Sequence, residues 1–199
     1  PYGLLRDLLA WRFEILDSDS QVVAQTKLAQ GLAPVLGERA AEYTALIGRL
    51  IGFDYGGDRH IAAIAGEGKQ IRDRAYHALA QYFRLVHHQD GAPIVVVLDD
   101  LHWADDGSLD FVNHLAQSCR DVPMLLLGMT RPTLYERRPL WGSGQSNHQR
   151  VDLAPLSRRG TRQLVEALLR RLEAVPAALR DLLTTSAEGN PYFVEELVG

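Results

Sequence analysis

The sequence has few of the features that would assign it to an extracellular, membrane or nucleic-acid-binding protein. Cys119 is the only cysteine among 199 residues, which excludes an internal disulfide and any zinc site built on several thiolates, and which suits a reducing cytoplasm. No apolar run is long enough to cross a bilayer, and the first residues lack a basic region followed by a hydrophobic one. The formal net charge of -4, with mixed signs along the chain, gives no electrostatic reason to expect nucleic acid or a membrane as a partner. We therefore expect a cytoplasmic protein.

Two catalytic signatures are also missing. No serine stands in a Gly-x-Ser-x-Gly elbow, so acyl transfer has no obvious nucleophile. No Gly-x-x-x-x-Gly-Lys-Ser/Thr loop (Walker A) is present either. Residues 66–70 come nearest, but no predicted strand precedes them, Ala63 occupies the outer glycine position and Gln70 replaces the magnesium-binding hydroxyl. The chain starts without methionine inside an apparent helix over residues 2–13, and we expect it to be a fragment of a longer protein.

What is present is an ordinary globular composition, with 46% hydrophobic and 23% charged residues, enough for one core and a small appendage. Apolar spacing predicts a helical region over residues 1–90 and alternating strands and helices over 91–153. Only helices are predicted over 154–199. The expected helices of the first region cover residues 2–13, Ser20 (as the cap) to Gly31, 38–50 and 69–86, and the expected strands end at Asp99, Thr130 and Leu153.

The most informative stretch is residues 93–105, in which an unbroken apolar run stops at two adjacent carboxylates, Asp99 and Asp100. A β-branched run of this length, opened by Gly91 and Pro93, predicts a fully buried parallel strand. Ligands of open α/β sheets bind at the carboxyl ends of strands, where hard oxygen ligands suit a magnesium ion that bridges to nucleotide phosphates. This is a Walker B pattern. The alternative is that the two acids only end a core strand and cap the helix that follows.

Three segments carry a resemblance to a known family. The Asp-Asp-Leu-His-Trp-Ala-Asp of residues 99–105, after its apolar run, resembles the Walker B segment of the signal-transduction ATPases with numerous domains (STAND), which belong to the same broad class as the AAA+ ATPases. Residues 126–132 resemble the family's sensor segment, and residues 188–196 resemble its "GNPxFxxE" segment. The resemblance is closest to the ATPase module that follows class III adenylate or guanylate cyclase domains in large bacterial regulators, and that also occurs in large LuxR-type regulators. It covers roughly residue 92 to the end.

The first two segments suggest specific roles. In a phosphate-handling site, Asp99 would hold Mg2+, usually through water, and Asp100 would orient or deprotonate an attacking water, although the two neighbours could exchange these roles. Arg131, at the end of the next apolar run, would contact a terminal phosphate oxygen. Asp105 could support the site from behind or simply start a helix.

The third segment and the missing loop complete the expected site. By resemblance, Pro191 would touch the adenine ring from a lid, with Gly189 and Asn190 setting the turn, although a glycine stop followed by a helix-starting proline would also explain these residues. In the family the Walker A loop precedes a segment such as residues 2–6, so it would lie upstream of this chain. Its strand normally lies centrally in the sheet, and we expect its loss to leave a gap or an exposed edge, compensated either by a closed-up sheet or by edge pairing between chains.

The resemblance thus implies an α/β fold: an incomplete P-loop NTPase (ASCE/STAND) core with parallel strands and flanking helices over residues 1–153, and the beginning of a helical lid over 154–199. The expected function is an ATP- and Mg2+-dependent regulatory switch that communicates with other domains of the same polypeptide and is inactive as this fragment. Two alternatives remain at this point. One is a non-catalytic protein-interaction module on a degenerate NTPase fold; the other is a metal-dependent hydrolase built around Asp99, Asp100 and His102.

Overall fold

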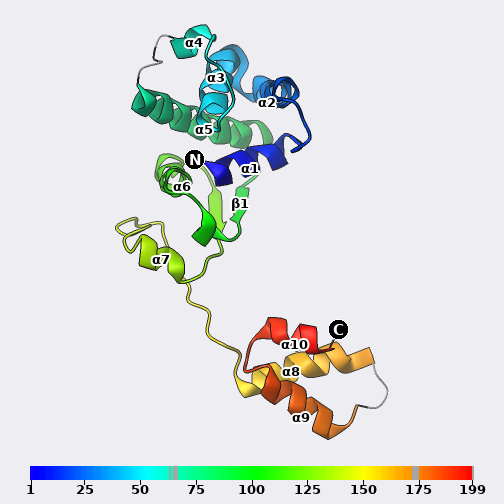
Figure 1. Cartoon of the computed structure of the whole chain (residues 1–199). Coiled ribbons are helices and arrows are strands. Elements are labelled where there is room, and N and C mark those ends of the chain that lie inside the picture. Colours follow the sequence, from blue (N-terminus) through cyan, green and yellow to red (C-terminus); the bar gives the residue numbers. More distant parts are fainter. Residues whose placement is uncertain (63, 65–66, 172–174, 199) are drawn as a thin grey trace. The chain divides into compact units, whose positions relative to one another are not determined.

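A computed structural model of the chain describes residues 1–62, 64, 67–171 and 175–198 (Figure 1). The chain divides into two compact units, Pro1–His148 and Gln149–Gly199, and each is described by itself. Over the ranges described, no helix is both long and apolar enough to span a membrane.

The first unit begins with a group of helices. They are α1 (Gly3–Arg12), α2 (Gln21–Leu36), the 3-10 turn η1 (Gly37–Arg39), α3 (Ala40–Leu50), α4 (Arg59–Ala62) and α5 (Gly68–Asp90). The side chain of Ser20 accepts a hydrogen bond from the Val23 amide (3.4 Å), which confirms the predicted cap. The predicted end of this helix at Gly31 was wrong, because α2 continues to Leu36. Gly31 is needed for packing instead: a Cβ there would lie 2.1 Å from the Phe13 ring.

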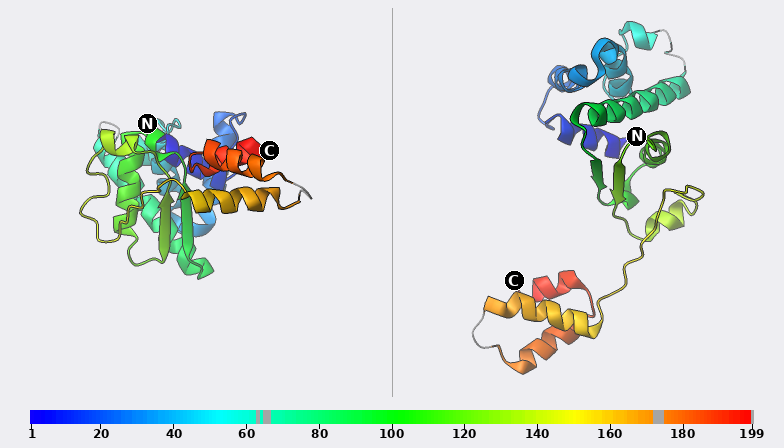
Figure 2. Two further views of the ribbon diagram at one scale, coloured as in Figure 1. Left: turned by 90° about the horizontal axis from the view of Figure 1, so that it is seen from below. Right: turned by 180° about the vertical axis from the view of Figure 1, so that it is seen from behind.

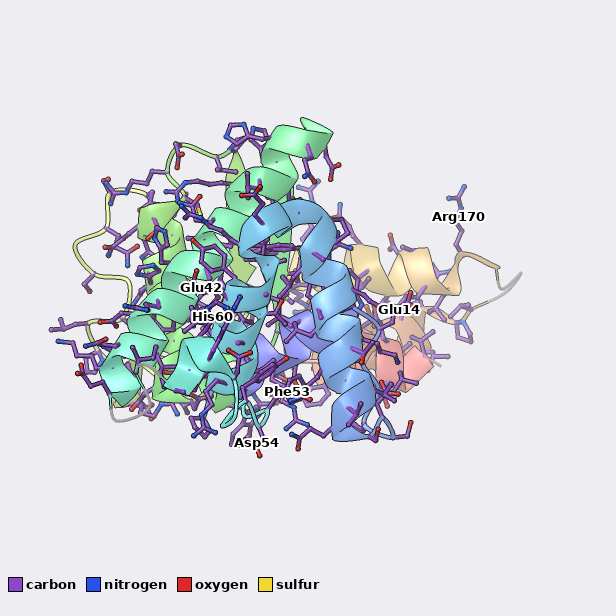
Figure 3. All side chains as sticks on the ribbon, turned by 90° about the horizontal axis from the view of Figure 1, so that it is seen from above. Glu14, Glu42, Phe53, Asp54, His60 and Arg170 are labelled. Carbon is purple, nitrogen blue, oxygen red and sulfur yellow. The ribbon has the colours of Figure 1, made fainter. Side chains whose placement is uncertain are left out.

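Long-range hydrogen bonds hold the loops of this helical group in place. Helix α3 packs between α2 and α5, and the loop after α3 is tied to α2 because Gln25 donates to the carbonyl of Asp54 (2.7 Å). Lys27 of α2 donates to the carbonyl of Glu14 (2.8 Å) and pairs with Asp19 (2.6 Å). Glu14 and Asp54 are labelled in Figure 3. At the other end of the group, α5 stops at Gly91, whose positive φ of 66° suits glycine.

The sheet of the first unit follows α5. Strand β1 (Ile94–Leu98) leads through the 3-10 turn η2 (Leu101–Trp103) and helix α6 (Asp106–Ser118) to β2 (Met124–Gly128), and α7 (Thr133–Arg137) comes after it. The two strands are parallel, in the register Ile94↔Met124 to Leu98↔Gly128, and they lie side by side in both views of Figure 2. A parallel pair joined by a crossover helix confirms the expected α/β class.

The prediction that the strand ending at Asp99 is fully buried was wrong, and the second strand is exposed on one face in the same way. One face of each strand contributes to the core, as Val96 and Leu98 do in β1, while the other face is open to solvent. The exposed side chains, with their exposed fractions, are Val95 (61%), Val97 (56%), Leu125 (56%) and Leu127 (48%). A parallel strand is buried on both faces only where elements cover both sides of the sheet, and the described residues cover one. The apolar run predicted the strand correctly but could not reveal what covers it.

The predicted strand over residues 150–153 was also wrong, since this segment has no regular secondary structure. Among the described residues, β1 and β2 pair only with each other, so there is no third ladder for the segment to join. Val151 (69% exposed) and Leu153 (93%) lack the cover that a strand in a core would give them. The sheet therefore ends at β2 on this side, and its outer edge is open.

The second unit is helical around a small core. Its elements are α8 (Arg158–Leu168), the 3-10 turn η3 (Leu169–Arg171), α9 (Ala177–Ser186) and α10 (Pro191–Val198). Helix α8 is capped by Ser157, whose hydroxyl accepts from the Gly160 amide (3.1 Å). The buried apolar side chains are Val165, Leu169, Leu183, Ala187 and Val194.

Candidate functional site

The two acids of the Walker B pattern lie in a short turn that is flanked by two backbone hydrogen bonds to Met129. The amide of Met129 donates to the carbonyl of Leu98 (2.8 Å), and the amide of Leu101 donates to the carbonyl of Met129 (3.0 Å). Asp99 and Asp100 are the two residues between these bonds, at the carboxyl end of β1. These two hydrogen bonds hold the backbone of the turn in place, while both side chains are exposed to solvent.

Both carboxylates are accessible. Asp99 accepts a hydrogen bond from the Asp100 amide at Oδ1 (2.8 Å), and the Asp100 side chain is 65% exposed. Asp100 has a left-handed backbone, with φ 50° and ψ 38°, a conformation for which Asp is several-fold enriched among non-glycine residues. This turn breaks the alternation of a strand, so the two neighbouring side chains need not point to opposite faces.

Arg131 follows β2 at the same edge of the sheet. Because the strands are parallel and in register, the residues after Leu98 and after Gly128 leave the sheet together. Arg131 is exposed, and its carbonyl accepts from the Leu134 amide (3.1 Å) at the start of α7. The topology thus brings the segment of Arg131 and two carboxylates to the carboxyl ends of the two strands. Such an arrangement can bind an anion and a cation at the same time.

The acids are followed in the chain by His102 and Trp103, two neighbouring aromatic side chains with different surroundings. The His102 side chain is only 4% exposed, whereas Trp103 is 77% exposed, and their rings lie 5.0 Å apart. The turn thus buries the imidazole of His102 and leaves the indole of Trp103 in solvent. Residues in a 3-10 turn face successive directions about 120° apart, which places neighbours in different surroundings.

Asp105 has a different role from Asp99 and Asp100, because its carboxylate is used inside the fold. It accepts from the amide of Ser108 (3.1 Å), from the Ser108 hydroxyl (2.8 Å) and from the amide of Gly3 (2.9 Å). It is therefore the cap of α6, which is the helix-start role considered for it from the sequence, and it links α1 to α6. Burial acts to raise the pKa of Asp105, but the hydrogen bonds from the Tyr2, Gly3 and Ser108 amides and the Ser108 hydroxyl lower the pKa to about 2.

We expect Asp105→Ala to lower the free energy of unfolding by about 1–2 kcal/mol near neutral pH, because it removes a helix cap and a link between two helices. The pKa is depressed in the folded state, so the stabilisation is present above the unfolded value of about 3.9 and is lost as pH falls towards the folded value. Urea unfolding of both proteins from pH 7 down to pH 2.5 measures the difference. It should shrink across the acidic range; a constant difference would show that the carboxylate charge contributes nothing.

The residues of the third segment belong to the second unit. Gly189 is buried with φ 81°, and its carbonyl accepts from the Leu156 amide (2.8 Å). Asn190 caps α10, because its Oδ1 accepts from the Tyr192 amide (3.1 Å). Pro191 is the first residue of α10 and is exposed. Gly189 and Asn190 thus have structural roles, while the Pro191 ring remains open to contact from outside.

The donor set at the sheet edge fits a magnesium ion that is completed by phosphate oxygens and water, which is how proteins commonly hold Mg2+. It does not fit an all-protein metal site, since the described part of the chain contains no group of three or more His, Cys, Asp or Glu side chains able to hold a metal. This removes the support for a metal-dependent hydrolase around Asp99, Asp100 and His102.

The segment around residues 66–70 was the nearest match to a phosphate-binding loop. Residues 63, 65 and 66 lie outside the described residues, and residues 68–70 form the first turn of α5.

Comparison with known proteins supports a nucleotide-hydrolysing module in general terms. The family model "AAA ATPase domain" matches residues 2–127. An uncharacterized protein of Rhizobium meliloti is 31% identical over 131 residues, which are 65% of this chain and 12% of that protein. The chain therefore spans only about an eighth of the length of this relative. No solved structure matches the chain.

Proposed function

This chain belongs to the AAA ATPase domain family, and on that premise we propose that it is a segment of an ATP-dependent regulatory switch. The observation that carries the proposal is the pair of exposed carboxylates held between two backbone hydrogen bonds at the carboxyl end of a parallel strand. Ligands of α/β sheets bind at this edge, and ATPases need carboxylates there for the metal and for water.

In this proposal each of the three residues at the edge has one task. Asp99 holds magnesium, and Asp100 orients the attacking water or accepts its proton. Arg131 places its guanidinium against the terminal phosphate, whose presence it reports to α7, since its own carbonyl takes part in the first turn of that helix. When bound, magnesium supplies a positive charge that neutralises the phosphate oxygens.

The second unit acts as the beginning of a lid over the adenine. Pro191 offers an exposed, rigid apolar ring at the start of α10, while Gly189 and Asn190 hold the turn before it in one shape. Nucleotide-dependent closure of such a lid would change the relative position of the two units, which is how a switch transmits a signal.

Phosphate binding needs more than these residues. A phosphate cradle is made of backbone N–H groups with a lysine and a hydroxyl, and the sequence contains no Gly-x-x-x-x-Gly-Lys-Ser/Thr motif. We infer that ATP and Mg2+ bind only when a longer polypeptide adds that loop, and that its strand pairs with the open edge of the sheet. The exposed face of Val95, Val97, Leu125 and Leu127 supports this, because additional elements would bury it.

Isothermal titration calorimetry of this chain with ATP and Mg2+ tests the inference. We expect no measurable binding and no phosphate release, since Asp99 and Arg131 cannot replace a missing lysine and backbone cradle. The matched comparison is a longer polypeptide of the same gene that contains a Walker A loop, which should bind. Micromolar binding to the 199 residues alone would contradict the inference.

The signalling context is also part of the proposal. The matched Rhizobium meliloti protein is about eight times longer than the aligned region, as expected of a multidomain protein, and the Walker B, sensor and lid segments resemble those of regulators with cyclase or LuxR-type output domains. Reading the gene on either side of this segment tests it. A Walker A loop upstream together with a cyclase or DNA-binding domain would support the switch, and a neighbouring metabolic enzyme domain would contradict it.

A non-catalytic interaction module is the second candidate, and the same open, apolar sheet favours it. In this case the face is covered by another protein molecule, for which a second copy joined at the sheet edge is the simplest arrangement. Sedimentation velocity over a range of concentrations distinguishes the two. A stable dimer that persists when the longer polypeptide is used would favour the module, and a monomer would favour the switch.

A further inference from the structure

His102 is a buried polar side chain whose ring nitrogens make no hydrogen bond to the part of the chain that the structure describes. Its side chain is 4% exposed, and neither Nδ1 nor Nε2 has a hydrogen-bond partner among the described residues. A buried donor or acceptor left unpaired costs about 1–3 kcal/mol, so such a group usually marks a position where a partner belongs. The surroundings of His102 therefore need an explanation beyond packing.

The closest candidate partner is Asp100. Its Oδ1 lies 3.7 Å from His102 Nδ1, just beyond hydrogen-bond distance. The backbone between the two residues is fixed, because they belong to one 3-10 turn in which the Trp103 amide donates to the Asp100 carbonyl (2.9 Å). The imidazole is held by burial, whereas the Asp100 side chain is 65% exposed and free to turn. A small rotation of the carboxylate therefore closes the gap without moving the imidazole.

We propose that His102 is a positioning residue whose Nδ1–H donates to the Asp100 carboxylate and fixes the orientation in which Asp100 acts on water. This rests on the proposed function, which gives Asp100 its catalytic task. A carboxylate that orients or deprotonates water must be held within hydrogen-bond reach of it, and an exposed side chain in a turn has several rotamers to choose from. A single donor from a rigid, buried ring selects one of them.

The proposal specifies the tautomer of His102. Donation from Nδ1 requires the proton on Nδ1, whereas a free neutral imidazole prefers it on Nε2, so the bond to Asp100 would invert the ordinary preference. A purely structural histidine that fills space beside Trp103 makes no such demand. The position of the proton therefore separates a positioning role from packing.

Long-range 1H–15N NMR of this chain at alkaline pH, where an imidazole is neutral, measures the tautomer directly. We expect the Nδ1–H form to dominate at His102, and Asp100→Ala to return the ring to the Nε2–H form. His102→Asn identifies the resonances. An Nε2–H ring in the unmodified chain, or an Nδ1–H ring that Asp100→Ala leaves unchanged, would overturn the proposal, and neither result depends on enzymatic activity.

Steady-state kinetics of the longer, loop-containing protein give a second readout. His102→Phe keeps the ring volume without a donor, and we expect kcat to fall about tenfold with KM within about twofold, because orientation of the water-activating group contributes a fraction of the 10²–10⁴ available from acid–base catalysis. His102→Asn restores a donor near the Nδ1 position and should recover most of kcat, whereas His102→Gln, with its amide near Nε2, should not.

Asp100→Asn in the same assay distinguishes the proposed catalytic role of Asp100 from the proposed positioning role of His102. If Asp100→Asn leaves turnover unchanged, the role of Asp100 itself is wrong, and the positioning role fails with it. If Asp100→Asn abolishes turnover while His102→Phe keeps full kcat, only the inference about His102 is overturned. Loss of kcat in all three His102 variants, with no recovery in Asn, would also contradict it, because it would indicate a packing role.

Discussion

Replacing Asp100 by Asn in a loop-containing form of the protein is expected to lower the rate of ATP hydrolysis by about 10²–10⁴-fold while sparing most of the affinity for ATP. Asparagine has the shape of aspartate but cannot accept a proton, and it carries no charge to orient a water. Asp99, the proposed magnesium ligand, is unchanged by the substitution. Phosphate release under saturating ATP measures the rate, and equilibrium binding of a fluorescent ATP analogue measures the affinity.

Asp17→Asn is a suitable control for this experiment. Asp17 is an exposed carboxylate in the loop between α1 and α2, and neutralising it changes the net charge of the protein by the same amount as Asp100→Asn. Turnover should be unaffected. Equal losses in both variants would show that overall charge matters rather than the position of the acid, and normal turnover in Asp100→Asn would refute its role with water.

Features of the fold that depend on neighbouring residues could be predicted from the sequence. The cap at Ser20 and the parallel strands after α5 follow from local hydrogen-bonding groups and apolar spacing. The predicted end of α5 at residue 86 was too early, because the helix continues to Asp90 and stops at Gly91. Burial could not be predicted in the same way. The run from Ile94 to Leu98 has the composition of a strand covered on both faces, but the exposure of Val95 and Val97 depends on which other elements are present.

In the candidate site, too, some features could be predicted from neighbouring residues and others depend on distant parts of the chain. A parallel register necessarily brings Asp99, Asp100 and the segment of Arg131 to one edge of the sheet, so the sequence was sufficient to expect these residues near one another. The sequence did not indicate that Asp105 faces inward to Gly3 or that both nitrogens of His102 are buried. These facts follow from contacts between segments about one hundred residues apart and from the path of a short 3-10 turn, neither of which leaves a periodic signal.

Gly189→Ala is expected to destabilise the second unit by about 2–4 kcal/mol, for two independent reasons. Gly189 has φ 81°, which is unfavourable for any residue with a Cβ by about 1 kcal/mol. A Cβ would also lie 2.6 Å from the carbonyl oxygen of Leu156 and 2.9 Å from Pro155, and relieving such a contact costs about 1–3 kcal/mol. The oxygen belongs to the backbone and cannot turn away as a long side chain could, and the hydrogen bond between the Leu156 amide and the Gly189 carbonyl would be lost as the segments part.

The second unit has a small core and therefore a small free energy of unfolding, so a loss of this size removes much of it. Hydrogen-exchange mass spectrometry should show amides of α8, α9 and α10 exchanging about 30-fold faster or more, since each 1.4 kcal/mol is a factor of ten. Gly144→Ala is the matched control: Gly144 has nearly the same φ of 78°, but nothing lies within 4 Å of its Cβ position and it belongs to the first unit. It should leave exchange in α8 to α10 unchanged. If Gly189→Ala did the same, the turn before Pro191 would not be held by Leu156, and the fixed presentation of Pro191 to a nucleotide would lose its structural basis.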